Sequence, residues 1–108
     1  MKISILLPYK ENFSPEYPGA VSLFVYETTR ISKFKKHITV YGNTNFKKKF
    51  PVKYINIEIK KNIITSQTKN YVKNFIKLEK FNKSSIIEIH NRPTYVKILT
   101  NQFKSRIV

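Results

Sequence analysis

The stretch SSIIEIHNRPTYV, residues 84–96, leads from an apolar segment into a histidine, an amide, a guanidinium and a proline. A neutral His90 imidazole both donates and accepts hydrogen bonds, which suits a sugar hydroxyl or a general base. Arg92 carries a planar fork of donors that suits a phosphate or a carboxylate. Asn91 is a residue type typical of a helix N-cap or a turn. The alternatives are that His90 packs or caps at a strand end and that Arg92 is a solvated cation of the turn.

Gly19 is a second candidate, because it stands between a polar loop and an apolar helical pattern. A glycine there lets the backbone approach a ligand, and the N–H groups of a helix N-terminus favour a phosphate or sugar oxygen. The alternative is that the glycine only permits the turn. The residues leave both interpretations open.

The composition excludes several kinds of site. The only glycines, Gly19 and Gly42, are too few for a dinucleotide fingerprint and too far apart for a P-loop. The chain has no aspartate and no cysteine, which removes Asp-x-Asp metal clamps, disulfides and thiolate sites. His37 and His90 alone do not make a zinc site, and no glutamate stands at ligand spacing from them. We therefore expect no metal and no cofactor.

The net charge of +15 raises the possibility of a nucleic-acid-binding module. Only 3 of the 21 basic residues are arginine, the residue that reads base edges best, so nucleic acid is not the first choice of partner. That alternative predicts aromatic side chains exposed among the lysines. Most aromatics fall instead on expected core faces, apart from Tyr9, Phe13 and Tyr17 in the first loop. The lysine-rich segments 33–36 and 47–49 are expected to be solvated, and the surface to attract anions.

The hydrophobic pattern predicts four strands and three helices. Short apolar segments indicate strands, and apolar residues at helical spacing indicate amphipathic helices. The strands are expected over 2–8, 37–42, 52–59 and 84–90, and the helices over 20–34, 66–81 and 93–105. This order favours an α/β fold, a Rossmann-like, mostly parallel sheet with helices on both faces. No linker or repeat divides the chain.

Each helix has an expected buried face, and the sheet an expected functional edge. The buried faces are Val21, Phe24, Val25, Thr28 and Ile31 in the first helix; Tyr71, Val72, Phe75, Ile76 and Leu78 in the second; and Tyr95, Val96, Leu99 and Phe103 in the third. Open α/β sheets bind ligands beyond the carboxyl ends of their strands. The loop 9–19, Gly42 with Asn43, and the corner 90–92 should meet there. His37, at the opposite edge, is expected to be structural.

Three stretches resemble a known family: ISILLPYKENFSPEYPGAVSLFVYETTR, HITVYGNT and IIEIHNRPTYVKIL. They are similar to the N-terminal, acceptor-side domain of GT-B glycosyltransferases of the family-four type. The resemblance implies a metal-independent enzyme that transfers a sugar from a nucleotide-sugar to a glycan or lipid-linked acceptor. It places Gly19 beside the donor's phosphate or sugar and His90 at the transferred sugar or the acceptor, with Asn91 and Arg92 supporting that corner.

The chain departs from the family pattern in two ways. It has one glycine in the first loop where many members have two, and the resemblance ends at the start of a fifth strand. We therefore expect residues 1–108 to be a partial N-terminal domain, inactive alone and lacking the C-terminal donor domain. The expected location is the cytoplasm, with peripheral contact between the lysines and an anionic inner membrane face. No segment has the roughly 18 apolar residues that a membrane span needs.

Overall fold

A computed structural model describes residues 1–59, 66–90, 92–103 and 108 of the chain. Its elements are β1 (Ile3–Leu6), α1 (Ala20–Ile31), a 3₁₀ turn (Lys35–His37), β2 (Ile38–Gly42), β3 (Tyr54–Asn56), α2 (Gln67–Asn82), β4 (Ile86–Ile89) and α3 (Pro93–Gln102). Each predicted strand and helix is present, with shorter bounds in most cases.

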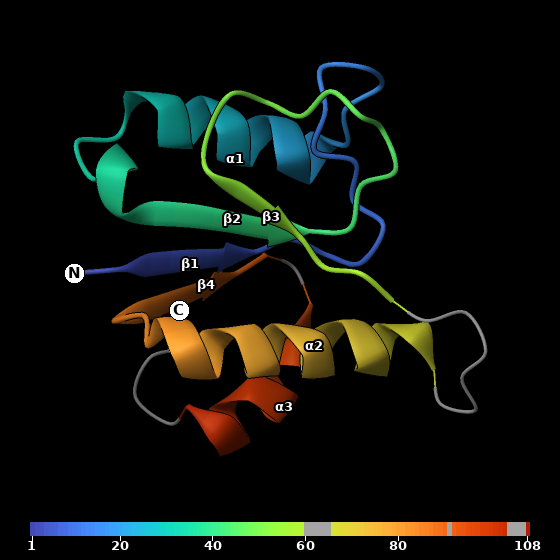
Figure 1. Ribbon diagram of the computed structural model, residues 1–108, viewed down its shortest axis with the longest axis vertical. Coiled ribbons are helices and arrows are strands. Elements are labelled where there is room, and N and C mark those ends of the chain that lie inside the picture. Colours follow the sequence, from blue (N-terminus) through green and yellow to red (C-terminus); the bar gives the residue numbers. More distant parts are fainter. Residues whose placement is uncertain (60–65, 91, 104–107) are drawn as a thin grey trace.

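The four strands form one parallel sheet in the order β3-β2-β1-β4. β1 lies in the interior, where Ile5 pairs with Val40 of β2 on one side and with Glu88 of β4 on the other. Helix α1 covers one face of the sheet, and α2 and α3 cover the other (Figure 1). The predicted Rossmann-like α/β fold with helices on both faces is confirmed.

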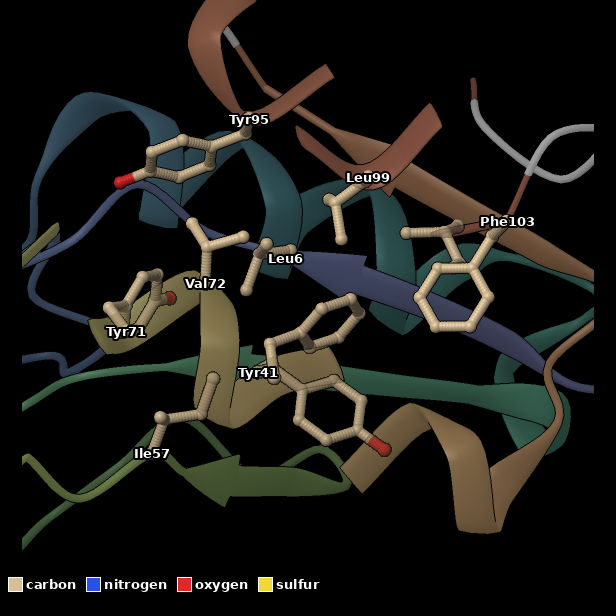
Figure 2. Close-up of a cluster of buried hydrophobic side chains, with 10 residues drawn as sticks. Leu6, Tyr41, Ile57, Tyr71, Val72, Tyr95, Leu99 and Phe103 are labelled. Carbon is tan, nitrogen blue, oxygen red and sulfur yellow. The ribbon is translucent and has the colours of Figure 1, made fainter. Parts of the chain in front are cut away.

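Alternation along β1 divides the apolar side chains between two cores. Ile5 and Leu7 join the core beneath α1, whereas Leu6 joins the core beneath α2 and α3. Figure 2 shows Leu6 in this second core with Val72 of α2 and Leu99 of α3. Because successive strand residues point to opposite faces, one short strand supplies both layers.

Capping chemistry explains where the second and third helices begin. The Ser66 hydroxyl accepts a hydrogen bond from the Lys69 N–H at 3.2 Å and caps α2. Pro93 stands in the first turn of α3, where its missing N–H has no cost. In α2, Tyr71, Val72 and Phe75 are buried as predicted.

The predicted buried face of α1 is wrong in part. Ser22, Val25 and Thr29 are buried, whereas Phe24 and Ile31 are 57% and 73% exposed. Two aromatic side chains from loops, Phe13 and Phe50, fill the core beneath this helix. The helix therefore turns small side chains toward the sheet and leaves large ones outside. Phe13, which we expected outside the core, is fully buried.

Other boundaries also differ from the prediction. His37 ends the 3₁₀ turn instead of opening β2. β3 has three residues rather than eight, and it lies at the edge of the sheet, where it pairs with β2 alone. The helix predicted over 93–105 ends at Gln102, and residues 104 and 105 lie outside the described part of the chain.

Val108 lies beside the outer edge of β4. Its N–H donates to the Ile87 carbonyl at 2.8 Å, and its carbonyl accepts from the Ile89 N–H at 3.0 Å. Two bonds that flank Glu88 in this way follow the pattern of a parallel ladder. Within the described residues, no helix is long and apolar enough to cross a membrane.

Candidate functional site

Two adjoining hollows lie where β1, β2 and β3 end, and both are lined by Lys10, Asn43 and Asn45. The larger, of about 530 Å³, is completed by Tyr9, Glu58, Ile59 and Gln67. The smaller, of about 250 Å³, is completed by Asn12, Thr44 and Phe46. This is the carboxyl edge of a parallel sheet, where ligands bind in open α/β folds. We refer to the two hollows together as the carboxyl-edge site.

Thr44 holds the loop after β2 in place. Its N–H donates to Asn56 Oδ1 at 2.8 Å, and its hydroxyl accepts from the Phe13 N–H at 2.9 Å and from the Tyr54 hydroxyl at 3.0 Å. Burial raises the pKa of Tyr54 to about 12, so this phenol remains a neutral donor. These bonds tie the loops after β1 and β2 to β3.

Gly42 allows β2 to end against the same phenol. A Cβ at position 42 would lie 2.9 Å from the Tyr54 hydroxyl oxygen and 3.1 Å from Leu7 Cδ1. The adjacent Asn43 donates its side-chain N–H to the Ile57 carbonyl at 2.8 Å. The absence of a side chain at Gly42 thus lets the strand end come close to its neighbours.

Tyr9 joins the helices to the end of β1. Its backbone N–H donates to the Tyr95 hydroxyl of α3 at 2.9 Å, and its own hydroxyl donates to Gln67 Oε1 of α2. The Tyr71 hydroxyl of α2 donates to the Leu7 carbonyl at 2.7 Å. Both helices on this face therefore position the rim of the larger hollow.

The structure gives Gly19 a specific neighbour, the carboxylate of Glu11. A Cβ at position 19 would lie 1.5 Å from Glu11 Oε2, and the same oxygen accepts from the Ser22 N–H at 3.2 Å. A carboxylate there satisfies a free N–H and complements the dipole of α1. The N-terminus of α1, expected to receive a ligand's anion, receives the protein's own carboxylate in this structure.

His90 is paired with Glu88, which points to the same face of β4. His90 Nε2 lies 2.6 Å from Glu88 Oε2, and the imidazole packs edge-on against the Phe24 ring of α1, 6.0 Å between centroids. An ionised carboxylate only accepts hydrogen bonds, so Nε2 carries the hydrogen. In the neutral imidazole, Nδ1 then keeps a lone pair that can accept a proton or a hydrogen bond.

Arg92, rather than Asn91, is the N-cap residue of α3. Its carbonyl accepts from the Tyr95 N–H at 3.0 Å and from the Val96 N–H at 3.4 Å, and its side chain is exposed. The N-cap alternative for Asn91 is therefore wrong. Asn91 itself lies outside the described residues, so the turn alternative stays a prediction.

The carboxyl-edge site includes only part of the predicted set. Asn43 and the loop 9–19 meet there, as expected for strands that end at one edge. Gly19, His90 and Arg92 are not among the described residues that line it. Asn45, Glu58 and Gln67 were missed, because they come from irregular segments and a helix start with no periodic signal. The described residues contain no group of three or more metal-ligating side chains.

Comparison with protein-family models, with curated proteins and with solved structures finds no match in any of the three. The description of the fold and of the site therefore depends on the sequence and the structure of this chain. They show a small Rossmann-like α/β domain with a four-stranded parallel sheet.

Proposed function

We propose that the chain forms the acceptor-side part of a glycosyltransferase that transfers a sugar from a nucleotide-sugar to a glycan or lipid-linked acceptor. The observation that carries this proposal is the carboxyl-edge site, whose larger hollow combines two asparagines, a glutamine, a phenol and a carboxylate. Such groups offer donors and acceptors together, as sugar hydroxyls require. The sequence resemblance supports the same function.

In this proposal, the side chains of Asn45 and Gln67 hold acceptor hydroxyls, and Lys10 meets a phosphate of the donor or of a lipid-linked acceptor. His90 uses Nδ1 to accept from a sugar hydroxyl, and Glu88 holds its imidazole in the required tautomer. Gly19, Asn91 and Arg92 keep the donor- or acceptor-binding roles that the resemblance assigns to them. No metal takes part.

Sugar binding is the first test, and it uses the chain as it is. Maltotriose and UDP-glucose are each titrated into the chain and followed by ¹H–¹⁵N NMR. We expect saturable chemical-shift changes at the amides of Tyr9, Asn43 and Asn45. Asn45→Ala removes an exposed amide from both hollows and should weaken binding at least fivefold. Asn101→Ala removes an exposed amide from α3 and should leave binding unchanged. No saturable shift with either sugar, or equal loss in both variants, contradicts the proposal.

Catalysis is expected to need a donor-binding domain in addition to residues 1–108. Stabilisation of the leaving diphosphate belongs to that domain in the family that the chain resembles. The purified chain should show no sugar transfer, and detectable transfer would contradict this part. The intact mass of the native gene product tells whether a second domain belongs to the same polypeptide.

A cytoplasmic location with peripheral membrane contact belongs to the same proposal. The charge of +15 is the only support for the membrane contact. Binding to vesicles should rise with their content of anionic lipid. Co-sedimentation that does not depend on anionic lipid would contradict it.

Exposed aromatics favour a second candidate, a basic module that binds single-stranded nucleic acid. Phe34, Phe46 and Phe81 are all exposed, Phe81 at 89%, and each has a lysine next to it in the sequence. Aromatic faces and lysines together suit stacked bases and phosphates. This candidate predicts that Phe81→Ala weakens binding of a 12-nucleotide single strand. It also predicts a steep loss of affinity between 50 and 200 mM salt.

A further inference from the structure

A separate hollow lies at the opposite edge of the sheet, where the four parallel strands begin. It measures about 300 Å³ and is lined by a residue that precedes each strand: Lys2 before β1, His37 before β2, Lys53 before β3 and Ser84 before β4. Parallel strands start at one edge, on the side of the N-terminus in Figure 1. Residues from four distant parts of the sequence therefore converge here. We refer to this hollow as the amino-edge pocket.

The lining of the amino-edge pocket is basic. Lys2, Lys36, His37 and Lys53 contribute, and all four side chains are exposed. No carboxylate is found among the described residues that line it. Several cations around one concave space raise the local potential and attract an anion.

Neutral polar side chains line the pocket beside the cations, together with Met1 and Ile55. The hydroxyl oxygens of Ser4 and Ser84 lie 2.5 Å apart, and the Asn82 side chain donates to the Tyr41 hydroxyl. Burial raises the pKa of Tyr41, and the charge of Glu79 raises it further, so the phenol stays neutral. Hydroxyl and amide groups beside lysines are the partners that phosphate oxygens require.

The nearby carboxylate of Glu79 is engaged within the fold. It is fully buried, and its two oxygens accept from the Ser4 hydroxyl at 2.9 Å and from the Ser84 N–H at 2.7 Å. Glu79 therefore orients Ser4 and Ser84. Among the described residues, no ion pair joins Glu79 to a lysine of the pocket.

Helix ends account for some of the lysines at this edge but not for those of the pocket. The carboxyl end of α2 reaches the pocket through Asn82, and the partial negative charge there favours Lys80 and Lys83. Lys2 and Lys53 precede strands. Because strands have small dipoles, the position of these two lysines is not explained by a backbone dipole.

We propose that the amino-edge pocket binds a phosphate group, in a ligand portion no larger than a diphosphate. The volume of about 300 Å³ stands at the small end of ligand pockets. Lys2, Lys36 and Lys53 supply the charge, and the side chains of Thr39 and Asn82, which also line the pocket, supply hydrogen bonds. This pocket lies at the opposite edge of the sheet from the carboxyl-edge site. The proposal for it does not rest on the glycosyltransferase proposal. The phosphate belongs either to a free diphosphate or to the phosphodiester of a nucleic acid strand.

The test is calorimetric titration with sodium pyrophosphate at constant ionic strength. Lys2→Ala/Lys53→Ala should weaken binding at least tenfold. Lys47→Ala/Lys48→Ala removes two exposed lysines elsewhere and lowers the net charge equally, so it should weaken binding less than twofold. Equal loss in both double variants would mean diffuse attraction to a basic chain and would overturn the proposal. Absence of binding by the unaltered chain would also overturn it. Circular dichroism checks that each variant is folded.

A second arm identifies the source of the phosphate. A 12-nucleotide oligothymidylate is titrated against the same variants and then in competition with pyrophosphate. Competition, together with loss only in Lys2→Ala/Lys53→Ala, assigns the pocket to a phosphodiester. Selective binding of pyrophosphate without competition assigns it to a free diphosphate. Both results support the pocket, and both are independent of any sugar binding at the other edge.

Discussion

Glycine is required at position 42 by a contact distance rather than by a special backbone conformation. A Cβ there would lie 2.9 Å from the Tyr54 hydroxyl oxygen, which is itself bonded to Thr44 and Asn56. The phenol cannot withdraw without losing those bonds, so an added methyl group is overpacked.

Gly42→Ala should lower the free energy of unfolding by about 1 to 3 kcal/mol, the usual cost of overpacking. Removing the hydroxyl with Tyr54→Phe should relieve part of that cost, so the two substitutions should be non-additive. Urea denaturation of the four members of the double-mutant cycle measures this. Strict additivity would show that the Tyr54 oxygen is not the obstacle.

Gly19 is constrained by a flexible partner, so its replacement should have a smaller effect. Gly19→Ala should displace the Glu11 carboxylate from the N-terminus of α1 and cost about 0.3 to 1 kcal/mol, the value of such a charge at a helix end. In a Glu11→Ala background, Gly19→Ala should be neutral, as thermal unfolding would show. A large cost in both backgrounds would mean that the glycine serves the backbone and not Glu11.

At the scale of elements, the sequence predicted the four strands and three helices of the described residues, and the burial of Tyr71, Val72 and Phe75 in α2, but not that of Glu79. These features depend on local patterns of apolar residues, and the Ser66 cap and Pro93 seen in the structure agree with them. It missed the orientation of α1, because Phe13 and Phe50 reach its core from loops, and long-range packing of loops leaves no periodic signal. In the candidate site too, local sequence patterns predicted some residues and missed others. Asn43 was found through strand order, whereas Glu58 and Gln67 were not found.

The orientation of α1 leaves two hydroxyls buried against the core. Ser22 Oγ and Thr29 Oγ1 have no hydrogen-bond partner among the described residues. A buried polar group without a partner keeps its desolvation cost. The helix therefore carries a removable penalty on its inner face.

Thr29→Val keeps the side-chain shape and removes the hydroxyl, so it should raise the free energy of unfolding by about 1 kcal/mol. Thr28→Val is the matched control, because the Thr28 hydroxyl is exposed and donates to the Phe24 carbonyl at 2.9 Å. The control should change stability by less than about 0.5 kcal/mol. Both values come from denaturant unfolding, and destabilisation by Thr29→Val would show that this hydroxyl is satisfied.

At the scale of the whole molecule, three tyrosines link the fold to alkaline pH. Burial raises the pKa of all three phenols. The pKa of Tyr41 is above its usual value, that of Tyr54 is raised to about 12, and that of Tyr71 is well above its usual value. The three phenols belong to the two sides of the sheet and to α2, so their ionisation affects both cores. In the unfolded chain, they lose their protons near pH 10.

Above pH 10, the unfolded chain therefore binds fewer protons than the folded one, and the free energy of unfolding falls as pH rises. The stability from these groups is fully present below pH 10. It is lost as pH rises through the folded pKa, which for Tyr54 means a window from about pH 10 to 12.

The variant Tyr54→Phe measures the contribution of Tyr54 to the fall in the free energy of unfolding above pH 10. At pH 8 the variant should be less stable, because it lacks the bonds to Thr44 and Asn56. From pH 10 to 12 only the unaltered chain has this phenol to ionise. The difference between the two should therefore shrink by about 1 to 2 kcal/mol, after allowance for partial exposure. Urea unfolding at pH 8, 10, 11 and 12, with phenolate absorbance followed in parallel, measures the difference. A gap that stays constant across this range would mean that Tyr54 ionises alike in both states and that its burial has no energetic consequence.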